Sequence, residues 1–467
     1  MTTRTSPVFS FRLFSSVGRG PVPRRCSISS LPPLWGRCRW GVLLPLVFLA
    51  SSQIPAPVQP HPIALIGATV HTVSGDTIIA GTVVFDNGKI TAVGKDIDIP
   101  YGAERIDVSG KQIYPGLITA QSQLGLVEIG AIRATVDTSE VGVINPDVRA
   151  EVAVNPDSEE IPVTRTNGVT TALTFPSGGL IAGTSALLRL DGWTWEDMTI
   201  KAPIGLDVNW PDMGGSRRRR RYQPQPAPQT DPLQPLNQAF ADARAYKKAK
   251  DAESRRDVPY HDADLRWEAM IPVLEKKIPV FAHASNIKQI ESAVQWAKDQ
   301  DVRLVIVGGA DAWRVTDLLK ANDVPVIIGG VLTTPSRVDE PYDSAYTLPL
   351  KLSQAGVKFC ISDGGDSANS RNIGYHAAMA VAFGLPPDEA LKAVTLYCAQ
   401  ILGVGDRLGS IEPGKDATLI VTDGDPLAIP TQTLAEYIDG RKIDLTNKQI
   451  LLYQKYREKY RQLGLIK

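Results

Sequence analysis

The stretch Gly110-Lys-Gln-Ile-Tyr-Pro-Gly-Leu-Ile-Thr-Ala-Gln-Ser-Gln-Leu-Gly125 decides the fold of this chain. Near the other end stands Gly409-Ser-Ile-Glu-Pro-Gly-Lys-Asp-Ala-Thr-Leu-Ile-Val-Thr-Asp-Gly-Asp-Pro426. In the first stretch, Gln121 and Gln123 are two residues apart. Residues with this spacing on a β-strand project from the same face, so we expect the two glutamines side by side.

Residues 63–93 alternate and turn like antiparallel sheet. Asn87-Gly88 lies between two apolar runs, and Asn-Gly is a strong hairpin signal because a type I′ turn needs a positive φ at both central residues. A similar pattern of apolar runs and turn residues recurs at 409–421. The two regions are therefore predicted to form one small β-domain from both ends of the chain.

Between these regions, apolar strand-like runs alternate with helical patterns. The runs lie at 168–174, 278–283, 303–307, 324–328 and 357–363. Alternation of this kind predicts a parallel sheet with crossover helices. Periodicity alone leaves two architectures open, a closed barrel and a doubly wound open sheet.

The two quoted stretches resemble the opening and closing motifs of the metal-dependent amidohydrolase superfamily. The family's opening motif is G-K-x-x-x-P-G-L-I-D-A-H-x-H-L-G, and the likeness is strongest to the imidazolonepropionase-like branch, over about residues 63–440. This resemblance implies an α/β fold, a (β/α)8 TIM-type barrel with a small β-sandwich domain. We place the sandwich at 62–113 and 406–440 and the barrel at 114–405.

The resemblance also implies a site. The family's H-x-H pair on the first barrel strand is replaced here by Gln121 and Gln123. His283 stands where the fifth strand carries a histidine, and Asp363 where the eighth carries the catalytic aspartate. The implied metal ligands are thus His283, Asp363, Gln121 and Gln123. Because amide oxygens are poor zinc ligands, we expect one divalent metal, such as zinc, to be weakly bound or absent.

For His283 and Asp363, the two family positions that this chain retains, a purely structural role is the alternative to a role in the site. A histidine after a strand can be a hydrogen-bonded structural residue. Asp363 precedes Gly364-Gly365, so a turn-forming role is open as well.

The resemblance implies a hydrolase of carbon–nitrogen bonds other than peptide bonds, acting on a small molecule, with Asp363 as the catalytic acid and base. Two alternatives remain: a non-catalytic protein that serves as a binding module or partner subunit, and hydrolysis without a metal. Homo- and hetero-oligomers are both open.

Overall charge is balanced, with 50 basic and 50 acidic residues. A nucleic-acid-binding protein normally shows a basic face, so we expect no nucleic-acid partner. The balance conceals an N-terminal bias: residues 1–50 contain seven arginines and no Asp, Glu or Lys.

An apolar run at 41–50 follows these arginines and is too short to span a bilayer. Residues 1–52 are therefore predicted to be a signal peptide that exports the protein to the periplasm or beyond, with no stable membrane anchor after its removal. A disordered tail is the alternative.

Two further segments are distinctive. Residues 212–236 contain five consecutive arginines and a Pro/Gln-rich stretch, which predicts a disordered insertion. Residues 445–467 predict a charged amphipathic helix capped by Thr446 or Asn447. We expect this helix to pack against the body of the protein.

The export prediction can be tested by mass. Cleavage after the apolar run should give a mature N-terminus between Ser51 and Val58. Intact-mass measurement on protein from the native envelope fraction checks this, and a full-length chain in the cytoplasm would contradict it.

Overall fold

The computed structural model describes residues 53–214, 231–253, 260–335, 337, 338 and 340–467. The predicted signal peptide lies outside these residues, as does most of the predicted insertion. The predicted end of that insertion is wrong, because helix α3 (Gln234–Ala252) already begins inside it.

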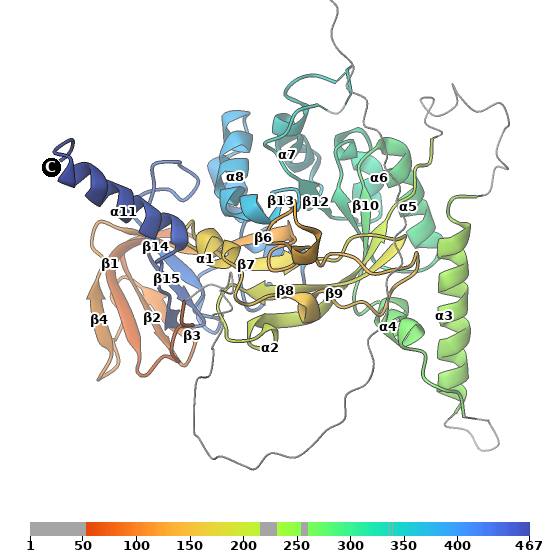
Figure 1. Ribbon diagram of the computed structural model, residues 1–467, viewed down its shortest axis with the longest axis horizontal. Helices are drawn as coiled ribbons and strands as arrows, with labels where there is room; N and C mark the ends of the chain where they lie inside the picture. Colours follow the sequence, from red (N-terminus) through yellow and green to blue (C-terminus); the bar gives the residue numbers. More distant parts are fainter. Residues whose placement is uncertain (1–52, 215–230, 254–259, 336, 339) are drawn as a thin grey trace, which may run out of the picture. The chain divides into compact units, whose positions relative to one another are not determined.

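One eight-stranded sheet draws its strands from both ends of the described chain (Figure 1). Strand β5 pairs with β14 in antiparallel register, with Ile113 opposite Val421. Phe85 and Tyr437, which are far apart in sequence, meet edge to face in its buried core at a ring distance of 5.1 Å. The predicted sandwich arrangement and the domain boundaries stay predictions. The strands are β1 (Ile63–His71), β2 (Thr77–Asp86), β3 (Lys89–Gly94), β4 (Glu104–Asp107), β5 (Gln112–Pro115), β14 (Leu419–Thr422), β15 (Thr433–Ile438) and β16 (Arg441–Lys442).

The second eight-stranded sheet curves into a nearly closed barrel, as expected of a TIM-type fold. Its ladder order runs from β13 to β6, and the two end strands approach where the Ser362 hydroxyl donates to Gln121 Oε1 at 3.4 Å. The strands are β6 (Leu117–Ser122), β7 (Val169–Thr174), β8 (Ile181–Arg189), β9 (Thr199–Asn209), β10 (Val280–Ala284), β11 (Leu304–Gly308), β12 (Val326–Gly329) and β13 (Phe359–Ser362).

One strand runs against the predicted parallel pattern. β6–β7 and all neighbours from β9 to β13 are parallel, but β8 is antiparallel to both β7 and β9. Only residues 175–180 join β7 to β8. A parallel connection needs a dozen or more residues, so this segment, which turns at Gly178-Gly179 with positive φ, can only reverse the chain.

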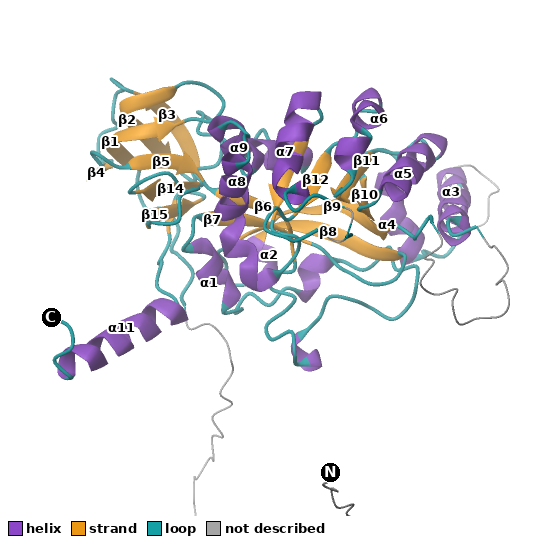
Figure 2. Ribbon diagram, turned by 90° about the horizontal axis from the view of Figure 1, so that it is seen from above, coloured by secondary structure: helices purple, strands orange, loops and turns teal. Residues whose placement is uncertain are grey.

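Helices cover the outer face of the barrel strands (Figures 1 and 2). Apolar side chains fill the layer between them, including Phe240, Trp296 and Trp210, whose rings pack edge to face. A separate apolar group fills the barrel itself, where Phe281 and Cys360 meet Cys398 of α10. The other helices are α1 (Glu160–Arg165), α2 (Trp195–Met198), α4 (Leu265–Leu274), α5 (Ile287–Asp299), α6 (Thr316–Ala321), α7 (Ser344–Ala355), α8 (Ile373–Ala382), α9 (Pro387–Ala393) and α10 (Leu396–Ile401).

The C-terminal helix α11 (Lys448–Gln462) begins at Asn447, whose side chain accepts from Ile450 N–H. This agrees with the predicted cap. The expectation that the helix packs against the body is wrong, because none of its residues is buried. Among the described residues, no helix is both long and apolar enough to cross a bilayer.

Gly205 on β9 gives a test of the packing inside the barrel. A Cβ at this position would lie 2.9 Å from three atoms of the buried Phe281 ring. We expect Gly205→Ala to lower the free energy of unfolding by about 1–3 kcal/mol, because overpacking a filled core strains it. Urea unfolding measures the change.

Gly130→Ala is the matched control, since a Cβ there meets nothing within 4 Å. Equal stabilities for the two variants would show that β9 and β10 are not packed as described.

Candidate functional site

The carboxyl ends of β10 and β13 lie at one edge of the barrel-shaped sheet, because the strands from β10 to β13 are parallel. His283 is the penultimate residue of β10, and Asp363 follows β13 directly. Barrel enzymes place their chemistry at this edge. We refer to it as the mouth of the barrel.

His283 is paired with a buried acid on the neighbouring strand. Its Nε2 lies 2.8 Å from Oδ1 of Asp207 on β9. The Asp207 side chain is 1% exposed, and burial raises its pKa while the hydrogen bond with His283 opposes that rise. A carboxylate in this position holds the ring proton on Nε2 and leaves Nδ1 as an acceptor.

The two oxygens of Asp363 have different roles. Oδ1 accepts a hydrogen bond from Gly365 N–H at 2.9 Å, which is the turn-forming interaction that the sequence left open. Oδ2 is buried without a hydrogen-bond partner among the described residues. Burial raises the pKa of Asp363 to about 6, although Ser370 and Gly365 act in the opposite direction. The carboxyl group thus carries an oxygen without a hydrogen-bond partner and has a pKa well above that of an ordinary aspartate.

Gln121 and Gln123 contact different residues. Gln121, inside β6, accepts from Ser362 beside Asp363, whereas Gln123 Nε2 donates to Ser177 Oγ at 3.2 Å. β6 ends at Ser122, and the same-face geometry of alternate residues holds only within a strand. Of the two glutamines, only Gln121 is therefore placed next to the Asp363 turn.

An aromatic ring contacts both His283 and the turn that carries Asp363. Phe175, directly after β7, stacks on His283 with 5.2 Å between ring centroids. Its far edge reaches the Asp363 turn, since a Cβ on Gly365 would lie 3.2 Å from Phe175 Cζ. Phe175 as a whole is 8% exposed. It therefore packs against both His283 and the turn that carries Asp363.

These donors do not fit a divalent metal. Zinc requires about four donors that converge on one point. Nε2 of His283 is engaged by Asp207, Gln123 donates to Ser177, and Phe175 packs against both His283 and the Asp363 turn. Across the described parts of the chain, no three His, Cys, Asp or Glu side chains gather as metal ligands would.

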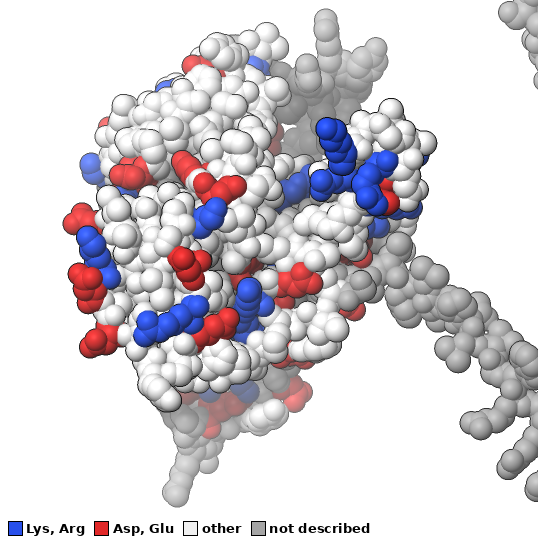
Figure 3. Space-filling model, turned by 90° about the vertical axis from the view of Figure 1, so that its left-hand side faces the viewer, with Lys and Arg blue, Asp and Glu red and all other residues white. Residues whose placement is uncertain are grey.

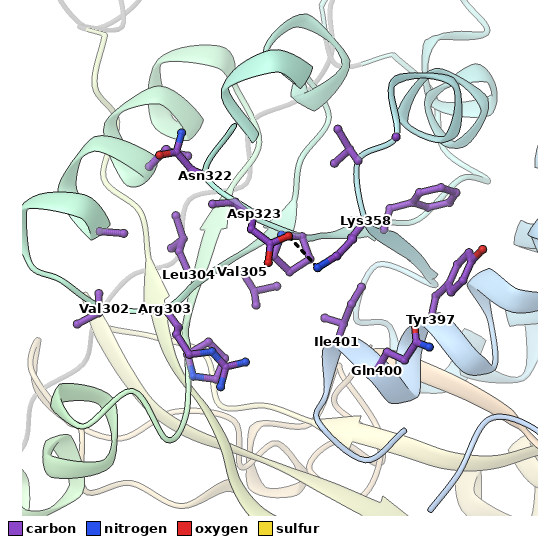
Figure 4. Close-up of a pocket in the computed structure, with 18 of the residues that line it drawn as sticks. Val302, Arg303, Leu304, Val305, Asn322, Asp323, Lys358, Tyr397, Gln400 and Ile401 are labelled. Carbon is purple, nitrogen blue, oxygen red and sulfur yellow. Dashed lines mark ion pairs between the residues drawn. The ribbon is translucent and has the colours of Figure 1, made fainter. Parts of the chain in front are cut away.

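A large cavity lies at the opposite end of the strands. It measures about 860 Å³ and is lined by residues that precede or begin β10 to β13, such as Pro279, Leu304 and Phe359. Figure 4 shows the Asp323–Lys358 ion pair, at 2.8 Å, across its centre. Neither His283 nor Asp363 lines this cavity, so it is not part of the mouth.

Sequence reasoning missed two residues of the mouth, Asp207 and Phe175. Asp207 is a lone acid in the otherwise apolar run Ile204–Val208, a placement that usually requires a partner. This signal was present in the sequence. Phe175 gave none, because its role depends on where its ring lies.

The comparisons with known proteins agree with this fold. A family profile described as Amidohydrolase family matches residues 345–448. Amidohydrolase tasK of Hapsidospora irregularis is 25% identical over 398 residues, which cover 77% of this chain and 39% of that protein. The chain thus spans about two fifths of the length of this relative.

Two further likenesses point the same way. An imidazolonepropionase of Thermoplasma volcanium is 33% identical over 109 residues, covering 22% of this chain and 27% of that enzyme. The crystal structure of an amidohydrolase from Thermotoga maritima has a TM-score of 0.74 and 28% identity, and covers 82% of this chain and 99% of that one. Sequence motifs, barrel and relatives agree: the chain belongs to the amidohydrolase superfamily, in its imidazolonepropionase-like branch.

Proposed function

We propose that this protein hydrolyses a carbon–nitrogen bond, other than a peptide bond, in a small molecule, with Asp363 as the group that moves the proton. The observation that carries the proposal is the state of this side chain. Its Oδ2 is buried without a partner, and its pKa is raised to about 6. A general base works best when its pKa is near the working pH.

The proposed chemistry uses residues at the mouth. The Asp363 carboxylate takes a proton from a water molecule as that water attacks the carbon of a cyclic amide or amidine. The C–N bond then breaks, and the same carboxyl group returns the proton to the departing nitrogen. His283, held by Asp207, borders the same mouth and offers Nδ1 as a hydrogen-bond acceptor that would orient the substrate.

A metal has no step in this scheme. The family is typically metal-dependent, but among the described residues no three donor side chains gather as metal ligands would, so the proton transfer is assigned to Asp363 alone. Export of the protein, its substrate and its oligomeric state also remain proposals.

The position of Phe175 favours a second candidate. A ring that stacks on His283 and reaches the Asp363 turn narrows the mouth and offers an apolar surface. A non-catalytic member of the family, kept as a binding module or partner subunit, would accommodate such a ring without loss of function.

The first prediction concerns Asp363 and pH. A panel of lactams, cyclic amidines and ureas is incubated with the protein, and hydrolysis is detected by mass as the addition of water. We expect the rate to fall as the pH drops through about 6, because protonation removes the base. Asp363→Asn should lose about 100-fold or more.

Stability provides the control for that variant. Because the folded-state pKa of Asp363 is raised, ionisation destabilises the fold as the pH rises through about 6. Asp363→Asn removes this penalty and should unfold at the same or higher urea concentration at neutral pH. Turnover that is unaffected by Asp363→Asn would overturn the mechanism, and ligand binding without turnover would support the non-catalytic candidate.

The second prediction concerns the metal. We expect protein purified without chelators to carry well under one zinc per chain, and Gln121→His with Gln123→His to add little. Phe175 packs against both His283 and the Asp363 turn, and Gln123 is engaged by Ser177. Adding Phe175→Ala should raise zinc uptake, since imidazole is a strong zinc ligand once donors can converge.

Elemental analysis measures the zinc content, and calorimetric titration the zinc affinity, of the unmodified protein, the double variant and the triple variant. Phe175→Ala alone is the control for opening the mouth without new ligands. A full equivalent of tightly bound zinc in the unmodified protein would show that the donors do converge.

A further inference from the structure

Helix α11 projects from the body of the molecule (Figures 1 and 2). Its base is fixed, because Asn447 is 5% exposed and its Nδ2 donates to Thr166 Oγ1 at 3.1 Å. From Leu451 onward, every residue is exposed. A helix of this length in water normally depends on packing of one face against a partner. Here the rest of the described chain provides no such partner.

One face of α11 carries aromatic and apolar side chains. Tyr453, Tyr456, Tyr460 and Leu463 follow one another at intervals of three, four and three residues. At 3.6 residues per turn, this spacing places them on a single face. Their exposures run from 46% to 65%. They form the Tyr face.

Basic residues flank the Tyr face on both sides. Lys455 and Lys459 are four apart on one side, and Arg457 and Arg461 are four apart on the other. The helix holds five basic residues and one acid, Glu458, which pairs with Arg461 at 2.8 Å. Figure 3 shows these lysines and arginines gathered on the protruding helix.

The apolar surface continues beyond the helix. Ile429, which is 73% exposed, lines the same cavity as Tyr453, and this cavity lies between the base of α11 and the body. After the helix come Leu465 and Ile466, also exposed. An exposed apolar surface bordered by charge indicates an interaction site.

We propose that α11 is a docking surface for a membrane that contains anionic lipid, on which the helix lies parallel to the surface. Tyrosine rings are stable at the level of lipid headgroups, where the ring is in an apolar environment and the hydroxyl is hydrated. Lysine and arginine on the flanks extend to the phosphates while their stems stay against the apolar layer.

The charges on α11 argue against dimerisation through the Tyr face as its main role. Two copies of α11 would bring basic flanks together with a single acid on each helix to offset them, and like charges across an interface are unfavourable. An anionic surface instead attracts each basic side chain near it. The proposal is independent of the function assigned to the barrel mouth.

The test is co-sedimentation of the full chain with vesicles. We expect binding to vesicles of phosphatidylcholine and phosphatidylglycerol, little binding to phosphatidylcholine alone, and weakening as salt rises. The charge variant Lys455→Gln, Arg457→Gln, Lys459→Gln should lose about fivefold in affinity per charge. The variant Tyr453→Ser, Tyr456→Ser, Tyr460→Ser should lose binding at every lipid composition.

Matched controls separate this surface from general basicity. Lys298→Gln, Arg303→Gln and Lys358→Gln remove three basic residues at the large cavity and should leave vesicle binding unchanged. No changed residue of α11 is buried, so thermal unfolding of the two α11 variants should match that of the unmodified protein.

Three results would overturn the proposal. One is absence of binding to anionic vesicles. Another is equal loss in the Lys298/Arg303/Lys358 control. The last is a dimer, seen by light scattering, that depends on the three tyrosines, together with no binding of the protein to vesicles.

Discussion

The parallel hydrogen-bonded ladder from β9 to β13 is the constraint on which the rest of the structure depends. Because these strands share one direction, His283 and Asp363 reach the same mouth although 79 residues separate them. The same ladder places Asp207 beside β10, where it meets His283. Without the ladder, each of these polar residues would be an isolated group in an apolar run.

The antiparallel strand β8 changes what the mouth can contain. In a regular barrel, the chain would leave β7 for an outer helix. Here it turns back within residues 175–180. Phe175 belongs to this short turn, so its ring stays over the mouth and stacks on His283. The aromatic ring at the site is thus a consequence of a short connection.

Two buried acids show how the site departs from an ordinary core. Asp207 and Asp363 both have pKa values raised by burial, which means that the fold keeps them at a cost in stability. Asp207 is compensated at Oδ1 by His283, while its Oδ2 is buried without a hydrogen-bond partner among the described residues. Asp363 is compensated only in part, by the Gly365 N–H and by Ser370, and its second oxygen is left over. Buried acids that lower the stability of the fold are common where a carboxyl group takes part in catalysis.

The sequence by itself determined the superfamily, most of the barrel strands, a helix cap at Thr446 or Asn447, and the two strand-end residues His283 and Asp363. These features rest on local patterns: apolar runs, turn residues and long motifs. Tertiary structure alone decided the reversed direction of β8, the His283–Asp207 pair, the divergence of Gln121 and Gln123, and the exposure of α11. The physical reason is that each of these depends on which distant surface a residue meets. A pattern of residues fixes the local conformation of a segment, whereas its partners are set only when the chain has closed around it.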